Sequence, residues 1–340
     1  MGTVPAGVAA GVATGVGSLP GIDFDAAVAA SFDALADLPH LPELPGRGPG
    51  ADMVGRVATR LVGLAVDRTP SGWRFVDRPT LDQRAAAQLL EADLDALLPV
   101  AGPGYDGALK LQLAGPWTLA AAIELPRGGA ALGDVGAVRD LVASLAETAR
   151  EHVADVRRRL PTARLVLQLD EPSLPAVLAG RVRTQSGLGT LRVPEEPDVV
   201  AALREVMGAV DVPVAVHCCA PQPPLRLFRS AGAAAVGVDL TAGAVDRDVL
   251  GELVEGGAVI WLGVVPSLGP GVPPVAREVA DPVRRLWREL GFAAEALPAS
   301  IGVTPACGLA GASPGWANTA YRLVGQVARA LSEAPEGVGA

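Results

Sequence analysis

Lysine, cysteine and histidine are scarce in this chain of 340 residues. Lys110 is the only lysine, and arginine supplies the other basic side chains, which we interpret as codon usage and not as function. The net charge is −9 and basic residues form no run, which argues against nucleic acids and anionic membranes as partners. Three cysteines, two of them adjacent, are not the even, spaced set of a disulfide framework. We therefore expect a reducing, cytoplasmic location.

Long apolar runs are missing as well. No run of about 18 apolar residues is free of Gly and Pro, so we expect no membrane span. The apolar N-terminus lacks the basic and leucine-rich parts of an export signal, and we expect a first β-strand there. Half of the residues are apolar and no shift in composition marks a linker. We expect a single domain over residues 1–340, with a frayed tail at about 334–340.

Short apolar or β-branched runs alternate with longer helical patterns, which indicates βα units around a parallel sheet. The helical patterns cover residues 80–97, 134–159, 197–210 and 275–290. The expected strands are 12–17, 35–41, 109–113, 164–169, 212–217, 234–240, 258–264 and 300–303. Eight such units in a chain of this length predict an α/β fold, a single (β/α)8 TIM barrel.

The active site of a TIM barrel lies at the carboxyl ends of its strands. His217 and Cys219 alternate at one strand end, so both can face the barrel mouth, while Cys218 should point the other way. Asp239 ends the next strand, and Cys307 follows the last one. Two thiolates, an imidazole and a carboxylate predict a tetrahedral Zn²⁺ site. In the alternative interpretation, the cysteines are small buried hydrophobes and the histidine is a core residue.

Other strand ends carry residues suited to a small polar ligand. Asp170 ends an apolar strand, where a carboxylate could bind an amine, act as a base or cap the next helix. Gly17 and Ser18 offer backbone N–H groups and a hydroxyl that suit a carboxylate. Glu43 follows the second expected strand. The remaining histidines have no metal-like spacing, and we give them no role.

Six motifs, in order, make the chain resemble the C-terminal catalytic barrel of cobalamin-independent methionine synthase, in a short form without the N-terminal domain. The motifs are Gly17-Ser18-Leu19-Pro20, Glu43 with Asp52-Met53-Val54, Gly115-Pro116-Trp117-Thr118, Gln168-Leu169-Asp170-Glu171-Pro172, His217-Cys218-Cys219 and Pro305-Ala306-Cys307-Gly308-Leu309. The resemblance implies that a zinc-bound homocysteine thiolate attacks a methyl group. It implies metal ligands at His217, Cys219 and Cys307, and binding of the amino-acid part of homocysteine at Gly17, Ser18, Glu43 and Asp170.

The chain departs from that family's pattern at four points. Asp239 stands where the family has a glutamate as fourth metal ligand, and the N-terminal barrel is missing. Residues 262–267 lack the family's general-acid histidine, and an alanine run at 120–122 replaces an aromatic residue associated with folate. Expelling the folate N5 requires a proton, whereas cobalt(I) leaves without one. We therefore expect methylcobalamin or a corrinoid protein to be the methyl donor.

Three alternatives stay open. The donor is methyltetrahydrofolate in the first. In the second, the protein is a methylcobalamin:thiol methyltransferase that resembles uroporphyrinogen decarboxylase and acts on another thiol, such as a mercaptoalkane sulfonate. In the third, it is a zinc-binding barrel without catalysis. Glu43 and Asp170 favour an amino-acid thiol, because a sulfonate would need a basic pocket. Retention of the soft ligands speaks against a loss of catalysis.

Overall fold

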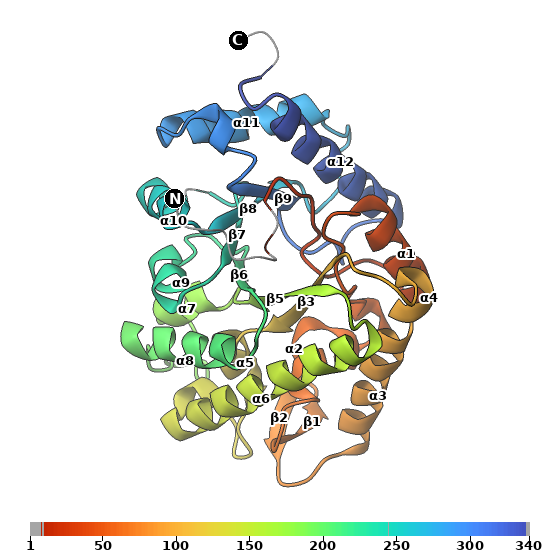
Figure 1. The fold of residues 1–340 in the computed structure, drawn as a ribbon. Coiled ribbons are helices and arrows are strands. Elements are labelled where there is room, and N and C mark those ends of the chain that lie inside the picture. The colour runs from red at the N-terminus through yellow and green to blue at the C-terminus, as the bar shows by residue number, and fades with distance from the viewer. Residues whose placement is uncertain (1–7, 9, 244, 338–340) are drawn as a thin grey trace.

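A parallel sheet of six strands forms the centre of the molecule, in the order β3-β5-β6-β7-β8-β9. The computed structural model describes residues 8, 10–243 and 245–337. The strands are β3 (Ala108–Ala114), β5 (Arg164–Asp170), β6 (Val214–Cys218), β7 (Ala235–Asp239), β8 (Val259–Val265) and β9 (Ile301–Pro305). Each of them matches an expected strand, with small shifts at the ends. The sheet is strongly curled, and helices surround it (Figure 1).

Two extended segments near the N-terminus lie between the outer strands of this sheet. They are joined to it and to each other by the isolated parallel bridges Ala13↔Val303, His40↔Lys110 and Ser18↔Glu43. The first segment thus borders β9, and the second borders β3. The expected strands 12–17 and 35–41 take their places in the barrel through these bridges and are not regular strands. Pro39 and Pro42 have no N–H to donate, and glycines interrupt the first segment, which limits continuous pairing.

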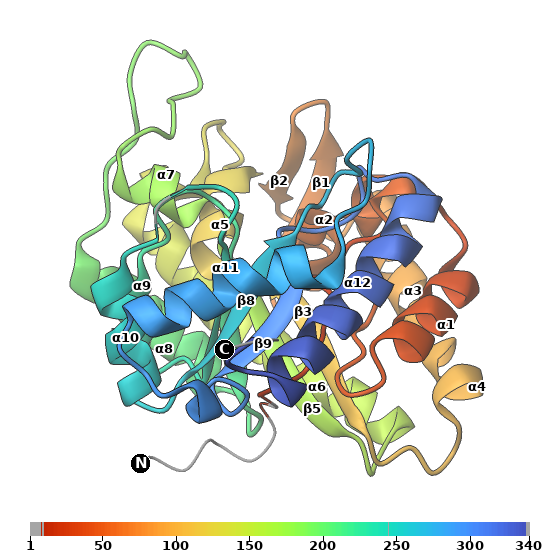
Figure 2. The same ribbon diagram turned by 90° about the horizontal axis from the view of Figure 1, so that it is seen from above.

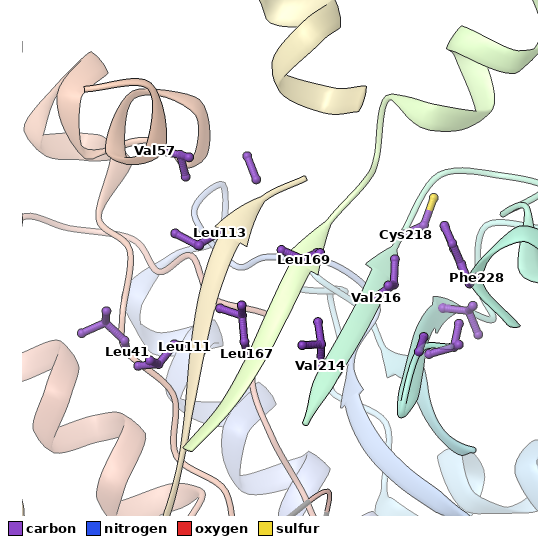
Figure 3. Close-up of a cluster of buried hydrophobic side chains, with 14 of the residues drawn as sticks. Leu41, Val57, Leu111, Leu113, Leu167, Leu169, Val214, Val216, Cys218 and Phe228 are labelled. Atoms are coloured by element: carbon purple, nitrogen blue, oxygen red, sulfur yellow. The ribbon is translucent and has the colours of Figure 1, made fainter. Parts of the chain in front are cut away.

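The central strands turn apolar side chains outward, toward the helices. Figure 3 shows this layer, in which Leu111, Leu113, Leu167, Leu169, Val214 and Val216 lie along three neighbouring strands. A second apolar cluster fills the inner face at the start of the strands: Val8, Val12, Leu38, Ala108, Val166, Ala215, Ala235, Val259 and Trp261. Because side chains alternate along a strand, the inner residues that follow are polar, namely Lys110, Gln112, Gln168, Asp170 and His217. The barrel interior therefore has an apolar floor beneath a polar upper layer.

The helices pack around the outside of the strands (Figures 1 and 2). Four amphipathic stretches were expected: α6 (Val135–Arg159), α8 (Glu196–Gly208) and α11 (Ala276–Glu289) correspond to three, and the fourth divides into α3 (Leu81–Asp95) and α4 (Leu97–Ala101). The others are α1 (Phe24–Ala34), α2 (Met53–Ala58), α5 (Pro116–Ala122), α7 (Leu174–Leu178), α9 (Leu225–Ala231), α10 (Arg247–Glu255) and α12 (Pro314–Glu333). No helix in the described part of the chain is long and apolar enough to cross a membrane.

A small sheet at the edge of the molecule was not expected. The strands β1 (Ala65–Thr69) and β2 (Gly72–Val76) form an antiparallel hairpin, and β4 (Ile123–Glu124) pairs with β2. Charged residues within both hairpin strands hide the alternation that predicts a strand.

The C-terminal tail, expected to be frayed from about residue 334, is partly attached to the protein. The carbonyl of Ala334 accepts a hydrogen bond from Arg284 at 3.0 Å. Residues 338–340 of the expected tail lie outside the described residues.

Candidate active site

The end of β6 directs its two last side chains to opposite faces of the sheet. His217 points into the barrel, where its Nδ1 atom lies 2.7 Å from Oδ1 of Asp170 on β5. Cys218 is fully buried in the outer apolar layer, near Phe228 of α9 (Figure 3). Burial raises the pKa of the Cys218 thiol to about 12, so this sulfur stays protonated at neutral pH. Cys218 therefore packs in the hydrophobic core, and His217 faces the barrel interior.

Cys219 and Cys307 meet across the barrel mouth. Their sulfur atoms are 2.8 Å apart, and both residues are free thiols that remain partly accessible. The hydrogen bond with Cys219 lowers the pKa of Cys307 to about 6, and the charge of the nearby His217 ring acts in the same direction. The same hydrogen bond and burial raise the pKa of Cys219. One thiol of the pair therefore ionises readily while the other keeps its proton.

The donor atoms at this place fit a zinc ion in their chemistry. Two sulfurs and one imidazole nitrogen are ligands that borderline-soft Zn²⁺ prefers. Because the Nδ1 atom of His217 faces Asp170, its Nε2 atom is left for a metal, as in the carboxylate–histidine–zinc arrangement. Among the described residues, no three His, Cys, Asp or Glu side chains already surround one point at metal-binding distances. The donor set therefore fits zinc by its chemistry, and the metal site itself stays a prediction.

Asp239 lies at the same level as the cysteines, on the next strand. Cys218 pairs with Val238 between β6 and β7, so the following residue of β7 is level with Cys219. The Oδ1 atom of Asp239 accepts hydrogen bonds from the backbone N–H and the hydroxyl of Thr241, at 2.6 and 2.7 Å. The carboxylate of Asp239 thus forms hydrogen bonds within the turn that follows β7. In the described part of the chain, no hydrogen bond joins it to a cysteine.

Two buried carboxylates, Asp170 and Glu43, differ in their hydrogen-bond partners. The Oδ1 atom of Asp170 is occupied by His217 and by the side-chain amide of Gln168, at 2.7 and 2.8 Å. Glu43 is 6% exposed, and no described group donates a hydrogen bond to its carboxylate. Burial raises the pKa of Glu43 to about 7, against the opposing charges of Arg56 and Lys110. An ammonium group would supply the partner that Glu43 lacks.

The segment with Gly17 and Ser18 comes close to the metal-ligand candidates. The N–H of Leu309 donates to the carbonyl of Ser18 at 2.8 Å, and the N–H of Glu43 donates to the carbonyl of Gly17 at 3.1 Å. A Cβ atom on Gly308 would lie 2.1 Å from Oγ of Ser18, so glycine is what allows this approach. The structure therefore brings Ser18 next to the residue that follows Cys307.

Glu171 caps a helix, a role that the sequence analysis considered for its neighbour Asp170. Its carboxylate accepts hydrogen bonds from the N–H groups of Trp117 and Thr118 at 2.9 and 2.8 Å, and from the Thr118 hydroxyl at 2.8 Å. These donors belong to the first turn of α5, whose N–H groups lack partners inside the helix. Burial raises the pKa of Glu171 to about 7. Asp170 is thereby free to face the barrel interior.

Sequence reasoning missed two polar residues inside the barrel. The Nζ atom of Lys110 donates to the side-chain oxygen of Gln168 at 2.5 Å and to the carbonyl of Val16 at 3.0 Å. Lys110 is completely buried, and burial lowers its pKa to about 7. The signal that could have found them was the period of two along the strands, which puts Gln168 on the same face as Asp170.

Comparison with known proteins identifies the family. The family model described as "Cobalamin-independent synthase, Catalytic domain" matches residues 107–330. The chain belongs to this family. It is a methyltransferase of the methionine synthase type, as the resemblance implied. The match starts just before β3 and ends within α12, so it includes Asp170, His217, Cys219 and Cys307 but not the two N-terminal segments.

The methyltransferase shares its fold with a solved relative. A B12-independent methionine synthase from Shewanella sp. W3-18-1, in complex with selenomethionine, superposes with a TM-score of 0.64 at 12% identity. The alignment covers 96% of this chain and 98% of that one, and it confirms the TIM-barrel prediction. An uncharacterized protein gives a TM-score of 0.29 at 15% identity over 75% of this chain and 67% of its own, which carries no weight. No curated protein matches the sequence.

Proposed function

We propose that this methyltransferase transfers a methyl group to the sulfur of homocysteine and forms methionine, with Zn²⁺ held by His217, Cys219 and Cys307. One observation carries the proposal. The barrel mouth combines a contacting pair of thiols, beside a histidine, with a buried carboxylate, Glu43, to which no group of the described residues donates a hydrogen bond. A thiol-bearing amino acid needs both a place for its sulfur and a partner for its ammonium group.

The residues of the chain act on the two ends of the substrate. Glu43 would bind the ammonium group, and the N–H and hydroxyl groups of the segment at Ser18 would bind the carboxylate. A zinc ion at the three ligands would supply the positive charge that keeps the substrate sulfur deprotonated at neutral pH. Asp170 would hold the ring of His217 in the orientation that faces this ion. Holding the sulfur in place lowers the entropic cost of reaction with the methyl donor.

The substrate class follows from the charge of the site. A buried acidic residue at the mouth suits an amino-acid thiol and disfavours a sulfonate, whose negative charge Glu43 would repel. The Shewanella relative was solved with selenomethionine, the selenium analogue of the proposed product. Both observations support an amino acid as the ligand of this site.

For the methyl donor we propose a methyl-folate. The family description names a synthase that works without cobalamin, so it does not support the expectation of methylcobalamin or of a corrinoid partner. One observation favours methylcobalamin as the second candidate: residues 262–267, in and after β8, contain no histidine that could protonate a folate. We further propose that the chain acts as one catalytic domain, because the N-terminal segments complete the barrel that carries the metal ligands.

A direct assay tests these proposals. Zinc-loaded enzyme is incubated with homocysteine and either methyltetrahydrofolate or methylcobalamin, and methionine is measured. We expect methionine to form, faster with the folate. Faster turnover with methylcobalamin would reverse the choice of donor and leave the acceptor unchanged. Cys307→Ala should lose both bound zinc and methionine formation. If Cys307→Ala keeps the metal and full activity, the metal site is misassigned.

A further inference from the structure

A continuous chain of hydrogen bonds runs from the single lysine to the metal-ligand candidate His217. Lys110 on β3 donates to Oε1 of Gln168 on β5, at 2.5 Å. Gln168 donates from Nε2 to Oδ1 of Asp170, at 2.8 Å. The same Oδ1 atom lies 2.7 Å from Nδ1 of His217 on β6. All four residues are buried and face the barrel interior, and the lysine is at the end that lies farther from the mouth.

Each step of this chain allows only one direction. A lysine ammonium group donates and cannot accept, so it must face the oxygen of the Gln168 amide and not its nitrogen. The nitrogen is then the end that faces Asp170, and it donates to the carboxylate oxygen Oδ1. This carboxylate in turn takes the Nδ1–H of His217, which leaves the lone pair of Nε2 for a metal. Lys110 and Gln168 thus hold the carboxylate that takes the Nδ1 proton of His217.

Packing alone does not explain why a lysine stands at this position. The floor of the barrel directly beneath it is apolar, with Val166 as its register partner on β5. Burying an ammonium group costs several kcal/mol unless partners compensate it. Lys110 is completely buried, with the charges of Asp170 and Glu43 nearby and the ring of Trp261 5.6 Å from its Nζ atom. An apolar residue would fill this place at a lower cost, so the lysine needs a role in the polar layer above it.

We propose that Lys110 and Gln168 are positioning residues of the metal centre, which set the tautomer and the orientation of His217 through Asp170. The inference rests on the proposed role of His217 as a zinc ligand. Lys110 and Gln168 also share an acceptor, because both donate to the carbonyl of Val16, at 3.0 and 2.8 Å. Val16 precedes the Gly17–Ser18 segment. The same pair therefore fixes the backbone that leads into the proposed binding place of the substrate carboxylate.

The affinity for zinc is the first test. Gln168→Glu keeps the shape of the side chain and an acceptor for Lys110, but it turns an oxygen toward Asp170 and removes the donor. We expect the zinc affinity, measured by competition with a chelator, to fall by up to about tenfold, because Gln168 acts on His217 only through Asp170. Lys110→Met should weaken zinc binding in the same direction. Gln83→Glu is the matched control, a buried glutamine that bonds Val66 and Thr59 outside the barrel, and it should leave the affinity unchanged.

The state of His217 in the metal-free protein is the second test, and it needs no variant. The chain has three histidines and one lysine, so ¹⁵N labelling of these residue types gives few and assignable signals. At alkaline pH, where the imidazole is neutral, we expect the proton of His217 on Nδ1. Below about pH 7, where Lys110 carries its proton, we expect a slowly exchanging Lys110 ammonium signal. In Gln168→Glu, the Nδ1 tautomer should lose its dominance. A loss of general stability would lower the melting temperature without moving this tautomer equilibrium.

The outcomes separate this inference from the proposed function. If His217→Ala binds zinc as tightly as the native chain, the ligand assignment itself fails. If His217→Ala loses zinc but Gln168→Glu and Lys110→Met bind it normally, the positioning role fails alone. A proton on Nε2 of His217 in the native metal-free protein also overturns it. The double variant Lys110→Met with Gln168→Glu should bind zinc about as weakly as Gln168→Glu alone, because both act through one path.

Discussion

The Nδ1 atom of His217 and the Oδ1 atom of Asp170 lie 2.7 Å apart, across the neighbouring strands β6 and β5. The two residues are also register partners in the parallel ladder, so the sheet itself fixes their distance. The family resemblance counts Asp170 among the residues that bind the amino-acid part of homocysteine, and His217 belongs to the proposed metal ligands. A change at Asp170 should therefore affect both metal and substrate, whereas a change at Glu43 should affect the substrate alone.

Glu43→Gln and Asp170→Asn are expected to differ in their effects. Removing the charge of Glu43 takes away a charge-assisted partner of the ammonium group, worth about 1.5–3 kcal/mol, which corresponds to an increase of about 10- to 100-fold in the KM for homocysteine. Zinc content should stay normal in this variant. Asp170→Asn should raise KM and also weaken zinc binding by about tenfold. Steady-state kinetics and metal titration measure the two effects, and normal zinc affinity in Asp170→Asn would contradict the pairing.

The three cysteines should react with iodoacetamide in a fixed order in the metal-free protein. The thiolate is the reactive form, and the pKa of Cys307 is lowered to about 6 by its hydrogen bond with Cys219. Cys307 should therefore be alkylated first at neutral pH, with a rate that falls as the pH drops below about 6. Cys218 should stay unmodified in the folded chain, because burial raises its pKa to about 12. Peptide mass spectrometry after timed labelling checks the order, and zinc should protect Cys307.

Gly308→Ala should disturb the binding of the substrate carboxylate and spare the metal. The new Cβ atom would lie 2.1 Å from Oγ of Ser18, so the hydroxyl must turn away. Losing one neutral hydrogen bond costs about 0.5–1.5 kcal/mol, so the KM for homocysteine should rise by up to about tenfold. Ser18→Ala should give a similar increase, and adding Gly308→Ala to it should change little, because the clash is gone. Loss of zinc in Gly308→Ala would contradict this account.

His152→Leu should change how stability depends on pH. His152 is buried in α6, and neither ring nitrogen has a hydrogen-bond partner among the described residues. Burial lowers its pKa to about 3, helped by the charges of Arg60 and Arg56. The unfolded chain binds a proton at an ordinary pKa of about 6.5. Between these two values the unfolded state binds more protons, so the stability is lost as the pH falls below about 6.5.

The size of this effect follows from the slope of about 1.4 kcal/mol per pH unit for one proton. From about pH 6.5 to about pH 5, the native chain should lose about 2 kcal/mol of unfolding free energy through His152, and His152→Leu should not lose this part. Urea unfolding at both pH values measures the difference. An equal loss in the native chain and in His152→Leu would show that the ring is not kept neutral by burial.

The strand ends could be predicted from the sequence, because chemistry-bearing residues stop apolar runs there. His217, Cys219 and Cys307 follow such runs, and the structure brings the two cysteines into contact. The alternation of side chains also placed Cys218 on the outer face. Both signals are local in the sequence. The hairpin β1–β2 gave no such signal, because its strands carry charges and pack at the edge of the molecule.

Long-range polar contacts could not be predicted from the sequence. Lys110 looks like an accident of composition until its partner on β5 is known, since the pairing depends on the register of two parallel strands. The different roles of Asp170 and Glu171 could not be predicted either. The sequence does not indicate which of two adjacent carboxylates accepts hydrogen bonds from the first turn of α5. The two hydrogen bonds from Thr241 to the carboxylate of Asp239 could not be predicted from composition either.

The close approach of Gly308 to Ser18 joins the two ends of the polypeptide. The carboxylate half of the site belongs to the first extended segment, and the thiol half follows the last strand of the sheet. During synthesis, the segment with Ser18 therefore leaves the ribosome long before Cys307. Contacts between such distant parts form late in folding, because the loop between them is long. An amino acid bound between these two segments would contact both of them. Its binding energy would therefore stabilise the barrel against opening between the first segment and the last strand.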